Sequence, residues 1–281
     1  MGEVTSTHHD ANVSASVCTA DPSTATRVWD QLSDDARMSR DEPLVAGLVL
    51  DLIDGCDTFA ESLARLAAAR IATPEIPRHV LTKEIHAVLS AHPSIMDAVA
   101  ADLQVSFERN PAYPNHLVPY LFAKGFLGFQ IHRVAHEMWN AGRVMAASFL
   151  QSRVSEVFAM DIHPAARVGS GILADHATGI VIGETAVMGD CVSILQGVTL
   201  GGTGKEDGDR HPKVGNGVLL SAGSNVIGNI SIGDNAKVAA GSVVLFDVPP
   251  FTTVAGVPAK VVRVGEPDVI PAEDMDQSIA R

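Results

Sequence analysis

A hydrophobic or small residue returns at every sixth position through much of the second half of this 281-residue chain. A period of six matches neither the 3.6-residue turn of an α-helix nor the two-residue alternation of a strand. It is typical of the hexapeptide repeat, in which three short strands form one triangular coil of a parallel β-helix. The repeat predicts a β-helix with core positions at Ile162, Val168, Ala174, Ile180, Ala186, Val192 and Val198, then Val214, Leu220, Val226, Ile232, Val238 and Val244.

The stretch GGTGKEDGDRHPK, residues 201–213, interrupts this repeat. Val198 and Val214 are sixteen residues apart, which is one hexad of six and ten extra residues. Loops inserted into a solenoid leave through one face without disturbing the stacking, and that face is often the binding face. The loop is not a phosphate-binding P-loop, because Thr199 stands where that motif requires a glycine. We therefore expect an extruded loop that carries Arg210 and His211 to a binding site.

The first half of the chain has helical periodicity. In FAESLARLAAARIA, Phe59, Leu63 and Leu66 fall on one face of a helix, and Pro74 follows its end. Residues 1–24 are small, polar and without period, which is typical of a disordered leader. The sequence thus predicts an α+β chain with four parts: a leader at 1–24, an α-helical domain at 25–158, a β-helix at 159–264 and a tail at 265–281.

Net charge and hydropathy exclude several classes of protein. The formal charge of −13 argues against a general nucleic-acid binder, which needs clustered Lys and Arg to neutralise phosphates. No apolar run approaches the roughly 18–20 residues that span a bilayer, and no basic segment followed by an apolar one marks a secretory signal. We therefore expect a cytoplasmic protein that binds neither nucleic acid nor membrane.

Two short motifs are more specific than the repeat: DHATG at 175–179 and GDRHPK at 208–213. Together with TTVAGVPAKVV and a helical first half, they resemble serine O-acetyltransferase, a hexapeptide-repeat acyltransferase of cysteine synthesis. The resemblance runs from about Arg27 to Gln277. It implies transfer of an acetyl group from acetyl-CoA to L-serine without a metal. It also implies a left-handed β-helix, a homotrimer with active sites between neighbouring β-helices, and a helical oligomerisation domain that joins two trimers into a hexamer.

Acetyl transfer to an alcohol needs a base for the hydroxyl proton, and histidine suits this role because its ordinary pKa lies near neutrality. The resemblance assigns the role to His176. It implies that Asp161 accepts the other imidazole N–H, although Asp161 lies fifteen residues before His176, three short of an eighteen-residue coil, so that spacing alone does not force contact. It further implies that Asp175 binds the ammonium group of serine. Arg210 would bind the carboxylate, while His211 would donate to the same carboxylate or line the acyl site.

The chain has no basic fingerprint for acetyl-CoA. Alignment with the family motif places the cofactor contacts at Gly202, Ala222, Ala240 and Lys260, of which Lys260 would meet a phosphate. Asn110, in FERNPAYPNHL, stands where the family usually has an aspartate that reaches a neighbouring site and helps to hold the amino group of serine. An amide keeps one acceptor oxygen but loses the charge, so we expect weaker binding of the amino acid.

The resemblance also implies two further partners. Cysteine shares its amino-acid head group with serine and is a candidate feedback inhibitor. Many family members end in an isoleucine that enters the active site of O-acetylserine sulfhydrylase, whereas this chain ends in Arg281. A cationic end fits an apolar pocket poorly, so we expect a weak or absent complex with that enzyme.

Other functions fit parts of the sequence. Because Asn110 departs from the family pattern, the acceptor could be a related amino alcohol such as homoserine. A γ-carbonic-anhydrase-like metal hydratase also uses a hexapeptide β-helix, but it needs two zinc-binding histidines close in sequence on that domain. His163, His176 and His211 include no such pair. A scaffold that binds the next enzyme of the pathway without catalysis is a third alternative.

Overall fold

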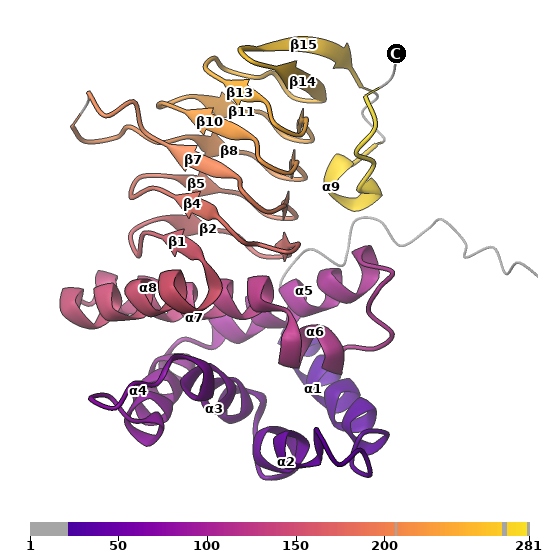
Figure 1. The fold of residues 1–281 in the computed structure, drawn as a ribbon, viewed down its shortest axis with the longest axis vertical. Coiled ribbons are helices and arrows are strands. Elements are labelled where there is room, and N and C mark those ends of the chain that lie inside the picture. The colour runs from indigo at the N-terminus through magenta and orange to yellow at the C-terminus, as the bar shows by residue number, and fades with distance from the viewer. Residues whose placement is uncertain (1–21, 206, 266–268, 280–281) are drawn as a thin grey trace, which may run out of the picture.

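The computed structural model of the protein describes residues 22–205, 207–265 and 269–279, and its helices form a base on which the β-helix stands (Figure 1). Residues 22–24, which the sequence analysis placed in the leader, begin the first helix; the rest of that predicted leader lies outside the described residues. The elements of the base are α1 (Pro22–Arg37), α2 (Ala46–Val49), the π-helical turn η1 (Leu50–Asp54), α3 (Phe59–Ile71), α4 (Arg78–Ala91), α5 (Pro93–Arg109), α6 (Leu117–Phe122), α7 (Lys124–Asn140) and α8 (Val144–Phe158).

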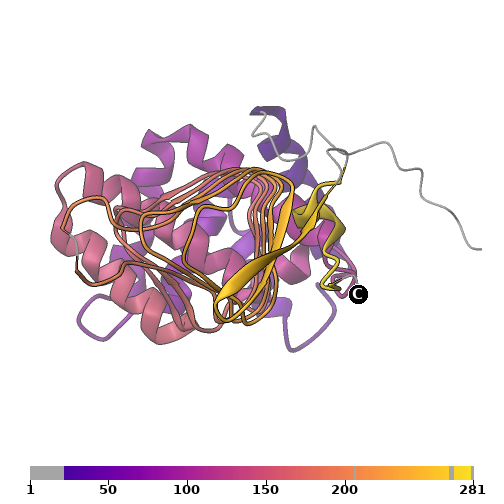
Figure 2. The same cartoon turned by 90° about the horizontal axis from the view of Figure 1, so that it is seen from above.

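Three sheets form the β-helix, and its coils superpose when the molecule is seen from above (Figure 2). Face A consists of β1 (Met160–Ile162), β4 (Ile180–Ile182), β7 (Thr199–Gly201), β10 (Asn225–Ile227) and β13 (Val243–Val244). Face B consists of β2 (Arg167–Val168), β5 (Val187–Met188), β8 (Lys213–Val214) and β11 (Ser231–Ile232). Face C consists of β3 (Leu173–Ala174), β6 (Ser193–Ile194), β9 (Leu219–Leu220), β12 (Lys237–Val238), β14 (Thr252–Gly256) and β15 (Ala259–Val264).

The predicted hexapeptide positions lie in the core of this β-helix. Val168 is partly buried, and the other twelve of the thirteen positions are buried. The strands pair in parallel except for β14 and β15, which form an antiparallel hairpin at the end of the β-helix. After this hairpin, the short helix α9 (Pro271–Asp274) and the residues that follow it return along face C. The predicted architecture, a helical half followed by a parallel β-helix, is confirmed.

The strand register shows where the extra residues of the chain are. Asn225 pairs with Val243, which gives a regular coil of eighteen residues (243 − 225). Asp161 pairs with Val181, twenty residues on, and Thr199 pairs with Asn225, twenty-six residues on. The first coil therefore has two extra residues and the third has eight. The sequence analysis was wrong to place all ten in one loop and to count the first coil as eighteen.

The two extra residues of the first coil enlarge the corner between β3 and β4, residues 175–179, which we call the His176 corner. His176 and Ala177 have φ angles of 56° and 61°, a left-handed conformation that is uncommon for residues with a side chain. Helix α7 lies directly against this corner because Gly125 has no side chain. A Cβ there would lie 2.2 Å from the carbonyl oxygen of Ala174 and 2.9 Å from the Cβ of Ala177.

A buried ion pair joins the helical base to the first coil. Asp102, fully buried on α5, accepts hydrogen bonds from Arg133 Nη2 at 2.7 Å and from the backbone N–H of Ile172 at 2.8 Å. Arg133, on α7, also donates to the carbonyl oxygens of Val168 at 3.2 Å and Gly169 at 2.6 Å. These bonds hold α5, α7 and the corner between β2 and β3 in one arrangement.

Candidate active site

The His176 corner presents an imidazole beside a carboxylate. The side chain of His176 is 73% exposed, and its Nε2 lies 3.6 Å from Asp175 Oδ2. Asp175 is itself only 18% exposed, and its Oδ1 accepts a hydrogen bond of 3.2 Å from Asn110 Nδ2. Asn110 follows the last residue of α5, so the helical base and the β-helix both contribute to this cluster. An exposed imidazole next to a half-buried carboxylate can take up a proton and can bind a cation.

The backbone of the corner is fixed from two directions. The N–H of Gly179 donates to the carbonyl oxygen of Ala159 at 2.7 Å, which places the corner over the start of β1. The ammonium group of Lys124, at the first position of α7, donates to the hydroxyl of Thr178. These bonds hold the left-handed backbone that directs His176 into solvent.

Asp161 lies near this corner, but its side chain projects from the outer surface of face A. It is an exposed residue of β1 on face A, and its Oδ1 accepts a hydrogen bond of 2.8 Å from Gln151 Nε2. Within the described part of the chain, no hydrogen bond or ion pair joins Asp161 to His176. The role of Asp161 as the partner of the imidazole stays a prediction from the resemblance.

The second cluster lies at the extruded loop, which leaves face A after β7 and returns to face B at β8. Arg210 Nη2 donates to Glu184 Oε2 at 2.6 Å, and its Nη1 donates to the carbonyl oxygen of Gly208 at 2.9 Å. The hydrogen bond from Arg210 is the main cause that lowers the pKa of the Glu184 carboxyl group. His211 is 7% exposed, and its Nδ1 lies 2.9 Å from Thr185 Oγ1. Arginine and histidine side by side provide donors for an anionic group.

The two clusters occupy opposite edges of face A. The His176 corner joins face C to face A, whereas the loop joins face A to face B. One chain therefore does not bring His176 to Arg210 and His211. Asn110 donates a hydrogen bond to Asp175 of its own chain, and its contribution to binding of the amino acid stays a prediction.

The predicted acetyl-CoA contacts are divided in the same way. Ala222 and Ala240 stand above the His176 corner, since the N–H of Gly241 donates to Ala222 at 2.8 Å in the same column of corners. Gly202 belongs to the loop cluster, where a Cβ on it would lie 3.5 Å from His211 Nε2. Lys260 is exposed on β15, at the far end of face C.

Three residues near these clusters were not found from the sequence. Glu184 and Thr185 belong to the corner after β4, and two polar side chains in succession at a turn of small residues were an available signal. Tyr113 is close to the other cluster: burial, and after it the negative charge of Asp175, raises the pKa of the Tyr113 phenol. The sequence offered no sign of this electrostatic effect beyond the nearness of Tyr113 to Asn110.

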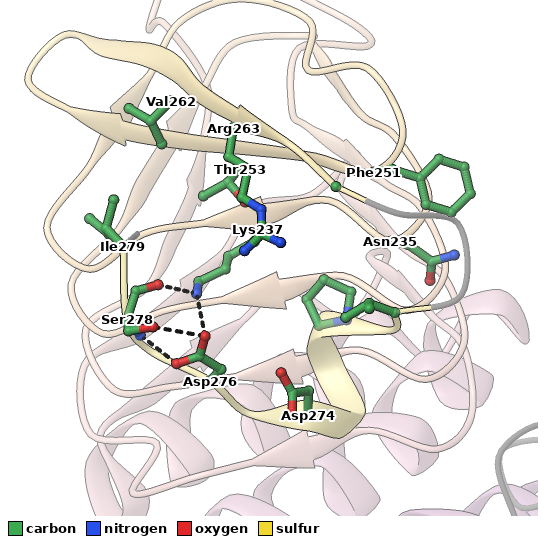
Figure 3. A pocket seen from close by; sticks show the side chains of 13 residues that line it. Asn235, Lys237, Phe251, Thr253, Val262, Arg263, Asp274, Asp276, Ser278 and Ile279 are labelled. Carbon is green, nitrogen blue, oxygen red and sulfur yellow. Dashed lines mark hydrogen bonds and ion pairs between the residues drawn. The ribbon is translucent and has the colours of Figure 1, made fainter. Parts of the chain in front are cut away.

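A cavity on face C lies between the sheet and the returning tail (Figure 3). Lys237 Nζ donates to the carbonyl oxygen of Ser278 at 2.6 Å and lies 3.9 Å from Asp276 Oδ2. Deeper on the same face, the hydroxyl of Ser193 donates to the carbonyl oxygen of Ala272 at 2.7 Å. Lys237 thus binds the chain's own tail.

Among the described residues, no group of three or more His, Cys, Asp or Glu side chains is arranged to hold a metal ion. In particular, His163 and His211 lie near the loop, while His176 lies at the opposite corner. The part of the chain that the structure describes contains no helix that is long and apolar enough to cross a membrane.

Two family models match the chain. The one described as serine acetyltransferase, N-terminal, matches residues 28–131, and the one described as bacterial transferase hexapeptide (six repeats) matches residues 211–245. The serine acetyltransferase of Escherichia coli (strain K12) is 45% identical over 252 residues, which cover 89% of this chain and 92% of that protein.

Solved structures agree with these matches. A serine acetyltransferase in complex with cysteine has a TM-score of 0.89 at 44% identity and covers 91% of this chain and 100% of that one. The serine acetyltransferase of Brucella abortus strain S19, in complex with coenzyme A, has a TM-score of 0.83 at 44% identity and covers 85% of this chain and 96% of that one. The similarity therefore includes both the helical base and the β-helix.

Proposed function

Because the chain belongs to the serine acetyltransferase family, we propose that its two clusters are halves of one active site, completed where two copies of the chain meet. The protein is an acyltransferase. It transfers the acetyl group of acetyl-CoA to the hydroxyl of L-serine and gives O-acetyl-L-serine and CoA, in cysteine biosynthesis. Membership of this family removes the metal-hydratase and scaffold alternatives. The cytoplasmic location stays a prediction.

In this proposal His176 is the general base. Its imidazole takes the proton of the serine hydroxyl as the hydroxyl oxygen attacks the thioester carbonyl carbon, and the tetrahedral intermediate collapses with loss of the CoA thiolate. The imidazolium then returns its proton to that thiolate, so the base is restored. Asp175 holds the ammonium group of serine, and Asp161 steadies the imidazolium. The support for the base is the exposed position of His176, with Nε2 3.6 Å from a carboxylate oxygen.

The second copy of the chain supplies Arg210 and His211, which bind the carboxylate of serine. Face A separates the two clusters within one chain, and its Val181 on β4 is 39% exposed. The corner that follows β13 at the edge of this face carries two more exposed apolar side chains, Leu245 (54%) and Phe246 (37%). In a homotrimer with face A turned toward the threefold axis, the His176 corner of each chain meets the loop of its neighbour. The helical base would then join two trimers. Cysteine would compete with serine for the same carboxylate and ammonium contacts.

Mixed trimers test this shared site. Chains with His176→Ala and chains with Arg210→Ala are each expected to be nearly inactive alone. Co-expressed in equal amounts, they form sites in which an intact His176 meets an intact Arg210. Random assembly places such a pair at about one interface in four, so roughly a quarter of wild-type activity should return. Activity that does not rise above that of the separate variants, in trimers shown to be mixed by mass, would contradict a site shared between chains.

Asn110→Asp tests the ammonium pocket. A second carboxylate beside Asp175 adds a charge-assisted hydrogen bond for the ammonium group, and the repulsion between the two carboxylates is relieved when the cation binds. We expect the KM for L-serine to fall by up to about tenfold, if ~1.4 kcal/mol is regained. The control is Asn115→Asp, which makes the same charge change five residues on and should leave this KM unchanged. An unchanged KM in Asn110→Asp, with a better wild-type kcat/KM for homoserine, would favour the alternative acceptor.

We propose that a complex with O-acetylserine sulfhydrylase is weak or absent. The last described residues of the tail are bound to the chain's own face C, with Ser278 held by Lys237 (Figure 3). Arg281, from which the sequence analysis predicts a weak or absent complex, lies outside the described residues. Titration calorimetry with the organism's own sulfhydrylase should give no submicromolar binding, and a tight complex would overturn this proposal.

A further inference from the structure

Thr185 makes an unusual number of bonds to the end of the extruded loop. Its Oγ1 accepts hydrogen bonds from the backbone N–H groups of Arg210, at 3.0 Å, and of His211, at 3.1 Å. The same oxygen lies 2.9 Å from His211 Nδ1, and the backbone N–H of Thr185 points at this nitrogen from 3.2 Å. One residue in the corner after β4 therefore contacts both the backbone of the loop and the imidazole of His211.

These contacts determine which nitrogen of His211 carries the proton. A backbone N–H can only donate, so Nδ1 must accept and must be unprotonated. The hydroxyl oxygen already accepts two N–H groups, which leaves its own proton free to point at Nδ1. The carboxylate of Asp209 competes with Nδ1 for this proton. A hydrogen bond from the Thr185 side chain lowers the pKa of Asp209, after the larger effect of Lys213. Whichever acceptor the hydroxyl proton takes, the backbone N–H of Thr185 still donates to Nδ1. The single proton of the neutral ring is therefore on Nε2.

The ring is held in one orientation by close packing. A Cβ at Gly183 would lie 2.0 Å from His211 Cδ2, and a Cβ at Gly202 would lie 3.5 Å from His211 Nε2. The imidazole thus packs tightly against Gly183, while Gly202 leaves room for an ordinary contact beside Nε2. Burial, and after it the positive charge of Arg210, lowers the pKa of His211, so the ring is neutral at neutral pH. Nε2–H is then a donor with a fixed direction.

We propose that Thr185 is a positioning residue, which holds His211 as a neutral Nε2–H donor for the carboxylate of the acceptor amino acid. This inference rests on the proposed function for the carboxylate. An unprotonated Nε2 at this place would turn a lone pair toward an anion, whereas Nε2–H adds a second donor beside the guanidinium of Arg210. The two hydrogen bonds from the loop backbone to Thr185 Oγ1 fix the positions of Arg210 and His211 relative to each other.

Nitrogen NMR of the uniformly labelled, substrate-free protein tests the tautomer directly. The His211 resonances are assigned by their loss in His211→Gln. We expect the Nδ1 signal at the frequency of an unprotonated nitrogen and the Nε2 signal at that of a protonated one. A ring protonated on Nδ1, or on both nitrogens at neutral pH, would overturn the inference. Because no substrate is present, this result does not depend on whether mixed trimers recover activity.

Kinetics of two Thr185 variants test the positioning role. Thr185→Val keeps the shape but removes the hydroxyl, and we expect the KM for L-serine to rise by about fivefold, the effect of one net hydrogen bond, with kcat and the KM for acetyl-CoA within about twofold. Thr185→Ser restores the hydroxyl and should restore the serine KM. An unchanged serine KM in Thr185→Val, or equal defects in both variants at unchanged melting temperature, would contradict the proposal.

Discussion

Replacement of His176 by alanine is expected to lower kcat by about a hundredfold or more, the usual effect of removing a general base. Without the imidazole, water must take the proton of the serine hydroxyl, and attack on the thioester slows accordingly. The measurement is release of the CoA thiol from acetyl-CoA at saturating L-serine. Because the side chain is 73% exposed, its removal creates no cavity, and the melting temperature should be unchanged.

The matched control is His79→Ala, which removes an exposed imidazole on α4 far from either cluster. We expect wild-type kcat in this variant. Activity of His176→Ala within threefold of wild type would refute the assignment of the base. A fall in kcat together with a lower melting temperature would point instead to damage to the left-handed corner.

Asp102→Ala is expected to give the largest loss of stability. Removal of this carboxylate leaves the guanidinium of Arg133 buried without its counter-charge, and it leaves the N–H of Ile172 without an acceptor. Breaking one partner of a buried ion pair costs about 3–5 kcal/mol of unfolding free energy. Chemical denaturation of the variant measures this loss.

Glu108→Ala on the same helix is the control, because its exposed side chain contacts only the exposed end of Gln104 in the described hydrogen bonds. We expect a change within about 0.5 kcal/mol for this variant, as is usual at the surface. A loss of less than 1 kcal/mol in Asp102→Ala would show that the base and the β-helix are held together mainly by apolar contact.

Much of the fold could be predicted from the sequence because the β-helix is built from a local repeat. Each inward residue of a hexad fills the same prism, so a period of six reports the architecture without knowledge of any distant contact. The helical half was equally visible, since one apolar face at 3.6-residue spacing is enough to indicate a helix. The motifs around His176 and Arg210 could likewise be found, because each is a short continuous segment.

The positions of the extra residues could not be read from the repeat. Ala174 and Ile180 are six apart and both buried, yet the enlarged corner lies between them. In the register of the sheets, Ile162 stacks on Ile182 rather than on Ile180. In strands such as β4, an outward-facing residue stands between two buried ones, so the β-helix has two buried columns that are two residues apart in sequence. After a two-residue insertion, residues six apart are still buried, but they belong to different columns. The total of ten extra residues was correct, and only the register divided it into two and eight.

By itself, therefore, the sequence determined the repeat and the helical base, and it picked out the short motifs that carry the candidate site residues, because each depends on neighbours close in the chain. The tertiary structure decided which of these side chains meet. Asn110 and Asp175 are sixty-five residues apart and hydrogen-bonded, as are Thr185 and His211 across twenty-six residues. His176 and Arg210 are at opposite edges of face A, although the proposed function assigns both to one site. The reason is geometric: a coil returns the chain to the same face after eighteen residues or more, and only the register of its turns sets which corner each residue occupies.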